Sequence, residues 1–203
     1  MRLFLTSLFV SMLATVGLAG EAEQFLTHSG KVIAQPDFNS LPGVPWAIAK
    51  GKWEVANGVL VAAEKKEEKH SAVLWHNVSP ATAVIECEFE FDGAGSFLIG
   101  CDGKKHIGRL VVTPKLAKLS EDSTEVKGVH PGATLAEVKQ DLKRGQWCAV
   151  RYGWKDDKMF AVVDGRELVG QHPALSAVRA RWWFAVGGES VHIRNVKVSE
   201  GPP

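Results

Sequence analysis

Hydrophobic and polar residues alternate with a period of two along most of the chain after Trp53. The clearest example is the segment at 83–92, which reads AVIECEFEFD. Its apolar residues are Ile85, Cys87, Phe89 and Phe91, and its acidic residues are Glu86, Glu88 and Glu90. Such alternation is typical of an antiparallel strand with one face in a core and one in water. Similar short segments recur up to VHIRNVKV at 191–198 and predict an all-β protein.

Turn residues separate these segments. Asn57-Gly58 and Asp164-Gly165 are strong hairpin signals because both pairs tolerate positive φ. Ten or more short strands within roughly 180 residues fit one domain. We therefore predict a concanavalin A-like jelly-roll sandwich of two antiparallel sheets over residues 38–199, preceded by a lead-in of strand and loop over residues 20–37.

One helix is predicted near residues 134–144. Thr134 and Glu137 have the spacing of a capping box, and Gly145 stands where a helix would end. Apolar residues at helical spacing lie between them: Leu135, Val138 and Leu142. The expected helix has two to three turns and decorates the sandwich.

The last strand contains a change of phase. Val191 and Ile193 share one face, whereas Val196 and Val198 fall on the other if the alternation is regular. A β-bulge at Arg194-Asn195 would return both pairs to the core.

The first residues resemble a secretory signal. Met1-Arg2 is followed by an apolar stretch at 3–18 and by small residues, so residues 1–19 are expected to be a signal peptide cleaved after Ala19 or Ala22. The alternative, an uncleaved anchor, is disfavoured because the apolar run is short for a span of about 20 residues. We expect an exported bacterial protein, periplasmic or extracellular, that is not membrane-bound after cleavage.

Charge excludes several classes of partner. Removing residues 1–19 takes away Arg2 and leaves 23 basic residues, from 24, against 23 acidic ones. A neutral chain has no electrostatic case for binding nucleic acid. No zinc signature or phosphate-binding loop is present, so we expect no metal and no cofactor. We also expect a monomer.

Three cysteines, Cys87, Cys101 and Cys148, each lie in phase with apolar neighbours. Free cysteine on an inward face behaves as a small hydrophobe. A disulfide between Cys87 and Cys101 is the alternative in an exported protein.

The order of several segments resembles a known family. The segments are GKWEVANGVLVA, AVIECEFEF, GSFLIG, GQWCAVRY, FAVVDGREL and VHIRNVKV, preceded by Phe38, Leu41 and Trp46. Together they are similar to the 3-keto-disaccharide hydrolase domain, a secreted family with a concanavalin A-like (laminin G-like) fold. The resemblance covers roughly residues 38–198. It implies hydrolysis or elimination at glycosidic bonds of sugars oxidised at C3.

The chain departs from that family at two places. GAGSFLIG lacks the Asn of an Asn-Ser-Gly segment, and KHIGRLVVTP lacks the acid and amide of the strand that follows. The alternatives to a catalytic function are therefore a non-catalytic glycan-binding module and a structural or adhesion domain.

Glu86, Glu88 and Glu90 are the candidate catalytic residues. Alternate residues of a strand share a face at about 7 Å, a spacing near that of glycosidase carboxylate pairs. The alternative is that these glutamates form the solvent-exposed face of an amphipathic strand and have no catalytic role.

Tryptophan supplies the candidate sugar contacts, because seven occur against one tyrosine and aromatic rings stack on sugars. Trp182 is in phase with Phe184 and is assigned to the core. The predicted substrate-binding residues are Trp183, Arg181, Trp75 and His76.

Overall fold

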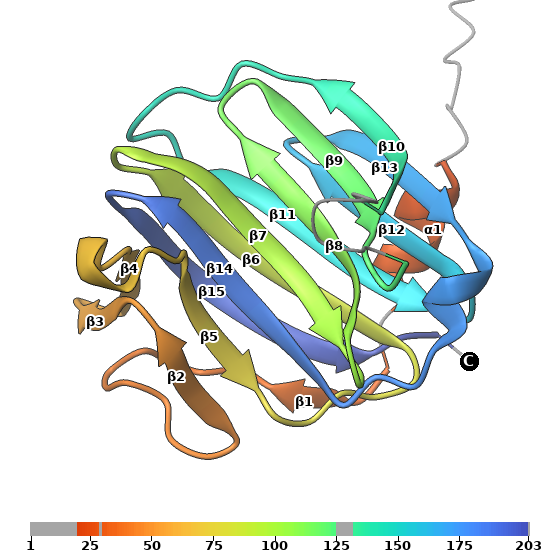
Figure 1. The fold of residues 1–203 in the computed structure, drawn as a ribbon, viewed down its shortest axis with the longest axis horizontal. Coiled ribbons are helices and arrows are strands. Elements are labelled where there is room, and N and C mark those ends of the chain that lie inside the picture. Colours follow the sequence, from red (N-terminus) through yellow and green to blue (C-terminus); the bar gives the residue numbers. More distant parts are fainter. Residues whose placement is uncertain (1–19, 29, 125–131, 203) are drawn as a thin grey trace, which may run out of the picture.

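The computed structural model describes residues 20–28, 30–124 and 132–202, and it consists of two stacked antiparallel sheets (Figure 1). The predicted signal peptide lies outside the described residues. One sheet has the order β13-β12-β11-β6-β15-β4-β3, with β1 paired to β15. Its strands are β1 Val32–Ala34, β3 Lys52–Ala56, β4 Val59–Ala63, β6 Ala83–Phe91, β11 Cys148–Lys155, β12 Lys158–Val163, β13 Arg166–Gln171 and β15 Val191–Glu200.

The second sheet has seven strands in the order β10-β9-β8-β7-β14-β5-β2. Its strands are β2 Trp46–Lys50, β5 Ala72–His76, β7 Ala94–Asp102, β8 His106–Thr113, β9 Leu116–Glu121, β10 Ala133–Lys139 and β14 Arg181–Gly188. Neighbours in both sheets often come from distant parts of the chain, as in β6 with β15 and β14 with β7. The predicted all-β jelly-roll sandwich is confirmed.

The core lies between the two sheets and is built by the inward residues of the alternating strands. Trp182 is fully buried in it beside Trp46 and Phe184, as predicted. The three cysteines are free and buried there. Burial raises the pKa of the Cys148 thiol to about 12, so this thiol is not a nucleophile at neutral pH.

The predicted helix at 134–144 is wrong, because Ala133–Lys139 forms strand β10, which pairs with β9. The register shifts between Thr134 and Ala136, so Leu135 is an extra residue in a β-bulge. The bulge turns both Leu135 and Val138 toward the core. Apolar residues three apart therefore reflect a change of strand phase here, rather than one face of a helix.

A short helix, α1 (Glu21–Thr27), lies in the predicted lead-in and packs on the outer face of the eight-stranded sheet beside β12 and β13 (Figure 1). Ala22, Phe25 and Leu26 form a small cluster with residues of that sheet, and the rings of Phe25 and Phe160 stack at 4.2 Å. Two 3-10 turns, Lys66–Glu68 and Pro173–Ser176, complete the elements. Within the described part of the chain, no helix has the length and apolar composition needed to span a membrane.

The predicted turns and bulge are confirmed. Asn57-Gly58 and Asp164-Gly165 join paired strands with positive φ at all four residues. The register of β15 against β6 shifts between Arg194 and Lys197, and Asn195 has a φ of 53°. Val196 and Val198 are buried in the core as a result.

Candidate functional site

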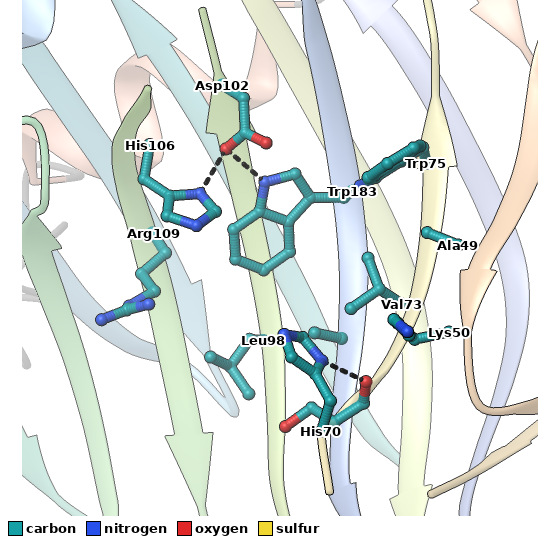
Figure 2. Close-up of a pocket in the computed structure, with 12 residues that line it drawn as sticks. Ala49, Lys50, His70, Val73, Trp75, Leu98, Asp102, His106, Arg109 and Trp183 are labelled. Carbon is teal, nitrogen blue, oxygen red and sulfur yellow. Dashed lines mark hydrogen bonds and ion pairs between the residues drawn. The ribbon is translucent and has the colours of Figure 1, made fainter. Parts of the chain in front are cut away.

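A groove of about 470 Å³ crosses the outer face of the seven-stranded sheet (Figure 2). We call it the sheet groove. It is lined by residues of β2, β5, β14, β7 and β8 and of the segment before β5: Ala49, Lys50, His70, Ser71, Val73, Trp75, Leu98, Asp102, His106, Arg109, Trp183 and Ala185. Its volume lies in the range of small-ligand sites, about 300–1,000 Å³.

The register of three strands places the two outward tryptophans side by side. Trp183 of β14 is directly opposite Trp75 of β5 on one side and Gly100 of β7 on the other. Gly100 has no side chain, so the Trp183 indole lies over it. A Cβ added at Gly100 would lie 2.3 Å from the indole. A glycine at this position is therefore what allows a large ring to lie flat on the sheet.

The floor of the groove is a hydrophobic cluster separate from the core. Val73, Trp183 and Ala185 are its buried members, and Ala49, Trp75 and Leu98 pack against them. These residues point away from the sandwich because strand neighbours alternate, so Trp183 faces out where Trp182 faces in. Trp183 is only 5% exposed and forms the bottom of the groove, whereas Trp75 is half-buried at its side.

Asp102, at the end of β7, organises the polar end of the groove (Figure 2). Its Oδ1 accepts hydrogen bonds from the Trp183 indole Nε1 at 2.7 Å and from His106 Nδ1 at 2.8 Å. Its Oδ2 lies 3.7 Å from Arg181 Nε. The carboxylate, 7% exposed, therefore fixes the orientation of an aromatic ring, an imidazole and a guanidinium.

His106 is held opposite Asp102 by the hairpin that joins β7 and β8. The hydrogen bond that the ring donates to Asp102 raises the pKa of the imidazole above its usual value, and burial opposes this shift. Arg109 and Asp122 also act on the ring, lowering and raising the pKa respectively. His106 is therefore charged over a wider pH range than a free histidine.

A basic end adjoins the groove beyond Asp102. We define it as Lys104, Lys105 and Arg181, which line a second hollow that shares Trp75, Asp102 and His106 with the groove. The Arg181 guanidinium lies over the Trp75 ring, 4.3 Å from its centroid, a cation–π contact. This contact keeps the guanidinium in place while its outer edge stays available.

Glu86, Glu88 and Glu90 lie on the outer face of the other sheet. Each is paired across to β15: Glu86 with Lys197 Nζ at 3.0 Å, Glu88 with Arg194 Nε at 2.6 Å, and Glu90 with His192 Nδ1 at 2.6 Å. The sandwich separates this ladder from Trp183, so the structure does not bring the two predicted sets together. Their assignment as catalytic residues stays a prediction.

His76 lies outside the groove that its neighbour Trp75 lines. It points into the core, is 1% exposed, and its ring stacks on Trp182 at 5.0 Å. Its Nδ1 is 2.9 Å from the carbonyl oxygen of Val78. Burial lowers the pKa of this imidazole, with a smaller opposing effect from that hydrogen bond. The sequence predicts His76 beside Trp75 in the binding site, but adjacent residues of a strand face opposite sides of the sheet, so only Trp75 lines the groove.

Three residues that build this site are absent from the sequence-based predictions: Asp102 and His106 in the groove, and Gly100 beneath Trp183. The sequence does contain a pattern that identifies Asp102 and His106 as neighbours. The segment DGKKH at 102–106 places an acid and a histidine on either side of a short turn, where hairpin pairing brings them together. Among the described residues, no group of three His, Cys, Asp or Glu side chains is arranged to hold a metal.

Comparisons with known proteins agree on the architecture. No family model matches the chain, and no curated protein matches its sequence. Solved structures do match. A carbohydrate-binding module, CBM66 from Bacillus subtilis, has a TM-score of 0.60 at 13% identity and covers 76% of this chain and 95% of its own.

Two glucanases are similarly close. The GH16 endo-β-1,3(4)-glucanase SCLam has a TM-score of 0.61 at 12% identity, over 83% of this chain and 90% of that one. A laminarinase from Flavobacterium sp. UMI-01 has a TM-score of 0.58 at 15% identity, over 84% of this chain and all of that one. At these identities the likeness establishes the fold: the chain has the jelly-roll sandwich found in carbohydrate-binding modules and GH16 glycosidases.

Proposed function

We propose that this protein binds a glycan in the sheet groove. The observation that carries the proposal is the second hydrophobic cluster, which lines an open groove on the outer face of a sheet instead of the core. An apolar floor with a few convergent polar groups, set in a groove of this volume, is the usual composition of a small-ligand site. Two tryptophans beside a few fixed polar groups match what a sugar ring presents, namely C–H faces and hydroxyls.

The polar side chains at the end of the groove are held in fixed orientations by one another. Asp102 is saturated by Trp183, His106 and Arg181, which leaves the free edges of the imidazole and guanidinium to contact ligand hydroxyls. Groups held in this way lose little conformational freedom on binding. The carbohydrate-binding module and glucanases of the same fold make a glycan the first ligand to test.

The test compares two surface tryptophans that have the same local contact on opposite sheets. Trp75 lies under Arg181 in the groove, and half-buried Trp147 lies under Arg194 on the other face, with the guanidinium 3.8 Å from the ring centroid. We expect Trp75→Ala to weaken binding in a polysaccharide panel by at least tenfold and Trp147→Ala to leave it unchanged. Equal effects of the two substitutions, or no binding to any glycan, would refute the proposal.

A second candidate, cleavage of a keto-sugar glycosidic bond, is favoured by the Asp102–His106 pair. A ketone at C3 acidifies the C2 proton, and a histidine base can remove it. The C1=C2 double bond then forms as the C1–oxygen bond breaks, and the departing oxygen takes a proton from water. The neutral imidazole is the base, and its raised pKa makes it a stronger one. Turnover of 3-keto disaccharides that is lost in His106→Gln would support this candidate. Turnover lost only in Glu86→Gln or Glu90→Gln would place the reaction on the other sheet.

We also propose that the protein is exported and acts as a monomer. Of the two cleavage positions, the one after Ala19 keeps α1 whole, whereas cleavage after Ala22 removes Glu21 and its ion pair with Lys158 Nζ at 2.6 Å. N-terminal sequencing of secreted protein tests this choice, and a mature chain beginning at Glu23 would contradict it.

A further inference from the structure

Charge is distributed unevenly over the groove and its basic end. The two hollows are lined by five lysine or arginine residues against two carboxylates: Lys50, Lys104, Lys105, Arg109 and Arg181 against Asp102 and Asp122. The whole chain, in contrast, carries 24 basic and 23 acidic residues. A local excess of one sign in a neutral protein attracts ligands of the opposite sign.

Both carboxylates are already engaged by groups of the protein. Asp102 holds Trp183, His106 and Arg181, and Asp122, which is 4% exposed, pairs with Arg109 Nη2 at 3.1 Å. Neither therefore presents a free negative charge to a ligand. Asp102 and Asp122 are both buried and paired, and they hold the neighbouring basic side chains in place.

Two lysines of the basic end have no ion-pair partner among the described residues. Lys104 and Lys105 are exposed on the turn between β7 and β8, and neither forms an ion pair within the described residues. On the opposite sheet, by comparison, each of Glu86, Glu88 and Glu90 has a basic partner on β15. Uncompensated lysines next to a guanidinium fixed on an aromatic ring form a site for a carboxylate or a sulfate.

We propose that the groove is selective for anionic glycans, whose sugar ring rests on the apolar floor formed by Trp183, beside Trp75, while a carboxylate or sulfate contacts Arg181, Lys104 and Lys105. This rests on the proposed function and adds the ligand class. The distance between the floor and the basic end is short, because both hollows share Trp75 and Asp102. One acidic sugar unit can therefore occupy both.

The test uses matched pairs of charged and neutral polymers: pectate and alginate against methyl-esterified pectin, and dextran sulfate against dextran. The variant is Lys104→Gln/Lys105→Gln. The control is Lys31→Gln/Lys52→Gln, which removes two exposed lysines beside the other sheet. Affinity is measured by calorimetry at low and high salt, because screening weakens exposed charge contacts.

We expect at least one charged polymer to bind about tenfold more tightly than its neutral counterpart. The groove variant should lose most of that difference, and the control should keep it. Pectate or alginate binding identifies carboxylate as the anion, and dextran sulfate binding identifies sulfate. Equal affinity within each pair, with Trp75→Ala weakening both members, would overturn the anionic selectivity and leave glycan binding intact. Absence of binding to every polymer would overturn both.

Discussion

The two outer faces of the sandwich are built from the same alternating strands but have opposite characters. On the eight-stranded sheet, acids of β6 pair with bases of β15, and α1 covers the neighbouring strands. In the groove and basic end of the seven-stranded sheet, the outward side chains are tryptophans, smaller apolar residues and bases, and the two acids, Asp102 and Asp122, are buried. The three glutamates of the first face are therefore paired with basic residues of the same chain. The second leaves an apolar floor and two uncompensated lysines within the described residues.

This difference shows why a row of carboxylates is a weaker functional signal than a row of supported aromatics. Glu86, Glu88 and Glu90 are conspicuous in the sequence, yet each has a cross-strand partner that accounts for it. Trp183 has no such explanation, since its strand neighbours already fill the core. Outward placement of a large ring requires Gly100 and Asp102, which contribute nothing to the core.

The largest expected effect on glycan affinity comes from removing the space that the Trp183 ring occupies over Gly100. Gly100→Ala forces the indole off the sheet, and we expect at least a tenfold loss of glycan affinity with about 1–3 kcal/mol lost from the free energy of unfolding. Gly95→Ala on the same strand is the control, because its added Cβ has 3.8 Å of clearance. Urea unfolding and calorimetry measure the two quantities. Wild-type affinity in Gly100→Ala would contradict the assignment of the groove.

On the outer face of the eight-stranded sheet, we expect a substitution that lowers stability to leave glycan affinity unchanged. Phe25→Ala removes the ring that stacks on Phe160 and should cost about 3 kcal/mol of unfolding free energy. Glycan affinity of the folded variant should not change, because α1 lies on the opposite side from the groove. A loss of glycan affinity in Phe25→Ala that matched its loss of unfolding free energy would contradict this separation of the two faces.

Two histidines should respond to pH with opposite signs. The raised pKa of His106 stabilises the fold fully below the ordinary value near 6.5, and this contribution is lost as pH rises through the raised pKa. The lowered pKa of buried His76 has the reverse effect, so its contribution is present above 6.5 and is lost as pH falls toward the lowered pKa. We expect His106→Gln to remove the loss on the alkaline side only, measured by urea unfolding from pH 5 to 8.5. An unchanged alkaline limb would show that the Asp102–His106 bond has no energetic role.

The smallest expected effect is at the glutamate ladder. Glu88→Gln weakens a partly exposed ion pair with Arg194, and such pairs contribute roughly 0.2–1 kcal/mol. Affinity for any groove ligand should be unaffected, as calorimetry would show. A large loss of binding would mean that this face, rather than the seven-stranded sheet, contacts the ligand.

The sequence predicted the faces of most strand residues, with His76 misplaced beside Trp75, and it predicted the proximity of strands poorly. Period-two alternation correctly separated Trp182 from Trp183, because facing depends only on local geometry. It misassigned residues 134–144, because a bulge at Leu135 imitates helical spacing. It also predicted catalytic glutamates and a substrate-binding Trp183 without showing that they lie on opposite outer faces. Which strands become neighbours is decided by long-range pairing, and here β6 and β14 lie in different sheets.

The indole N–H signals of ¹⁵N-labelled protein test the central claim most directly. Trp75 and Trp183 line the groove, and Trp147 reports on the opposite face. Titration with oligogalacturonate should shift the Trp75 and Trp183 signals, assigned through Trp→Phe variants, while the Trp147 signal stays in place. A shift of Trp147 with no change at Trp75 and Trp183 would contradict the placement of the site on the seven-stranded sheet.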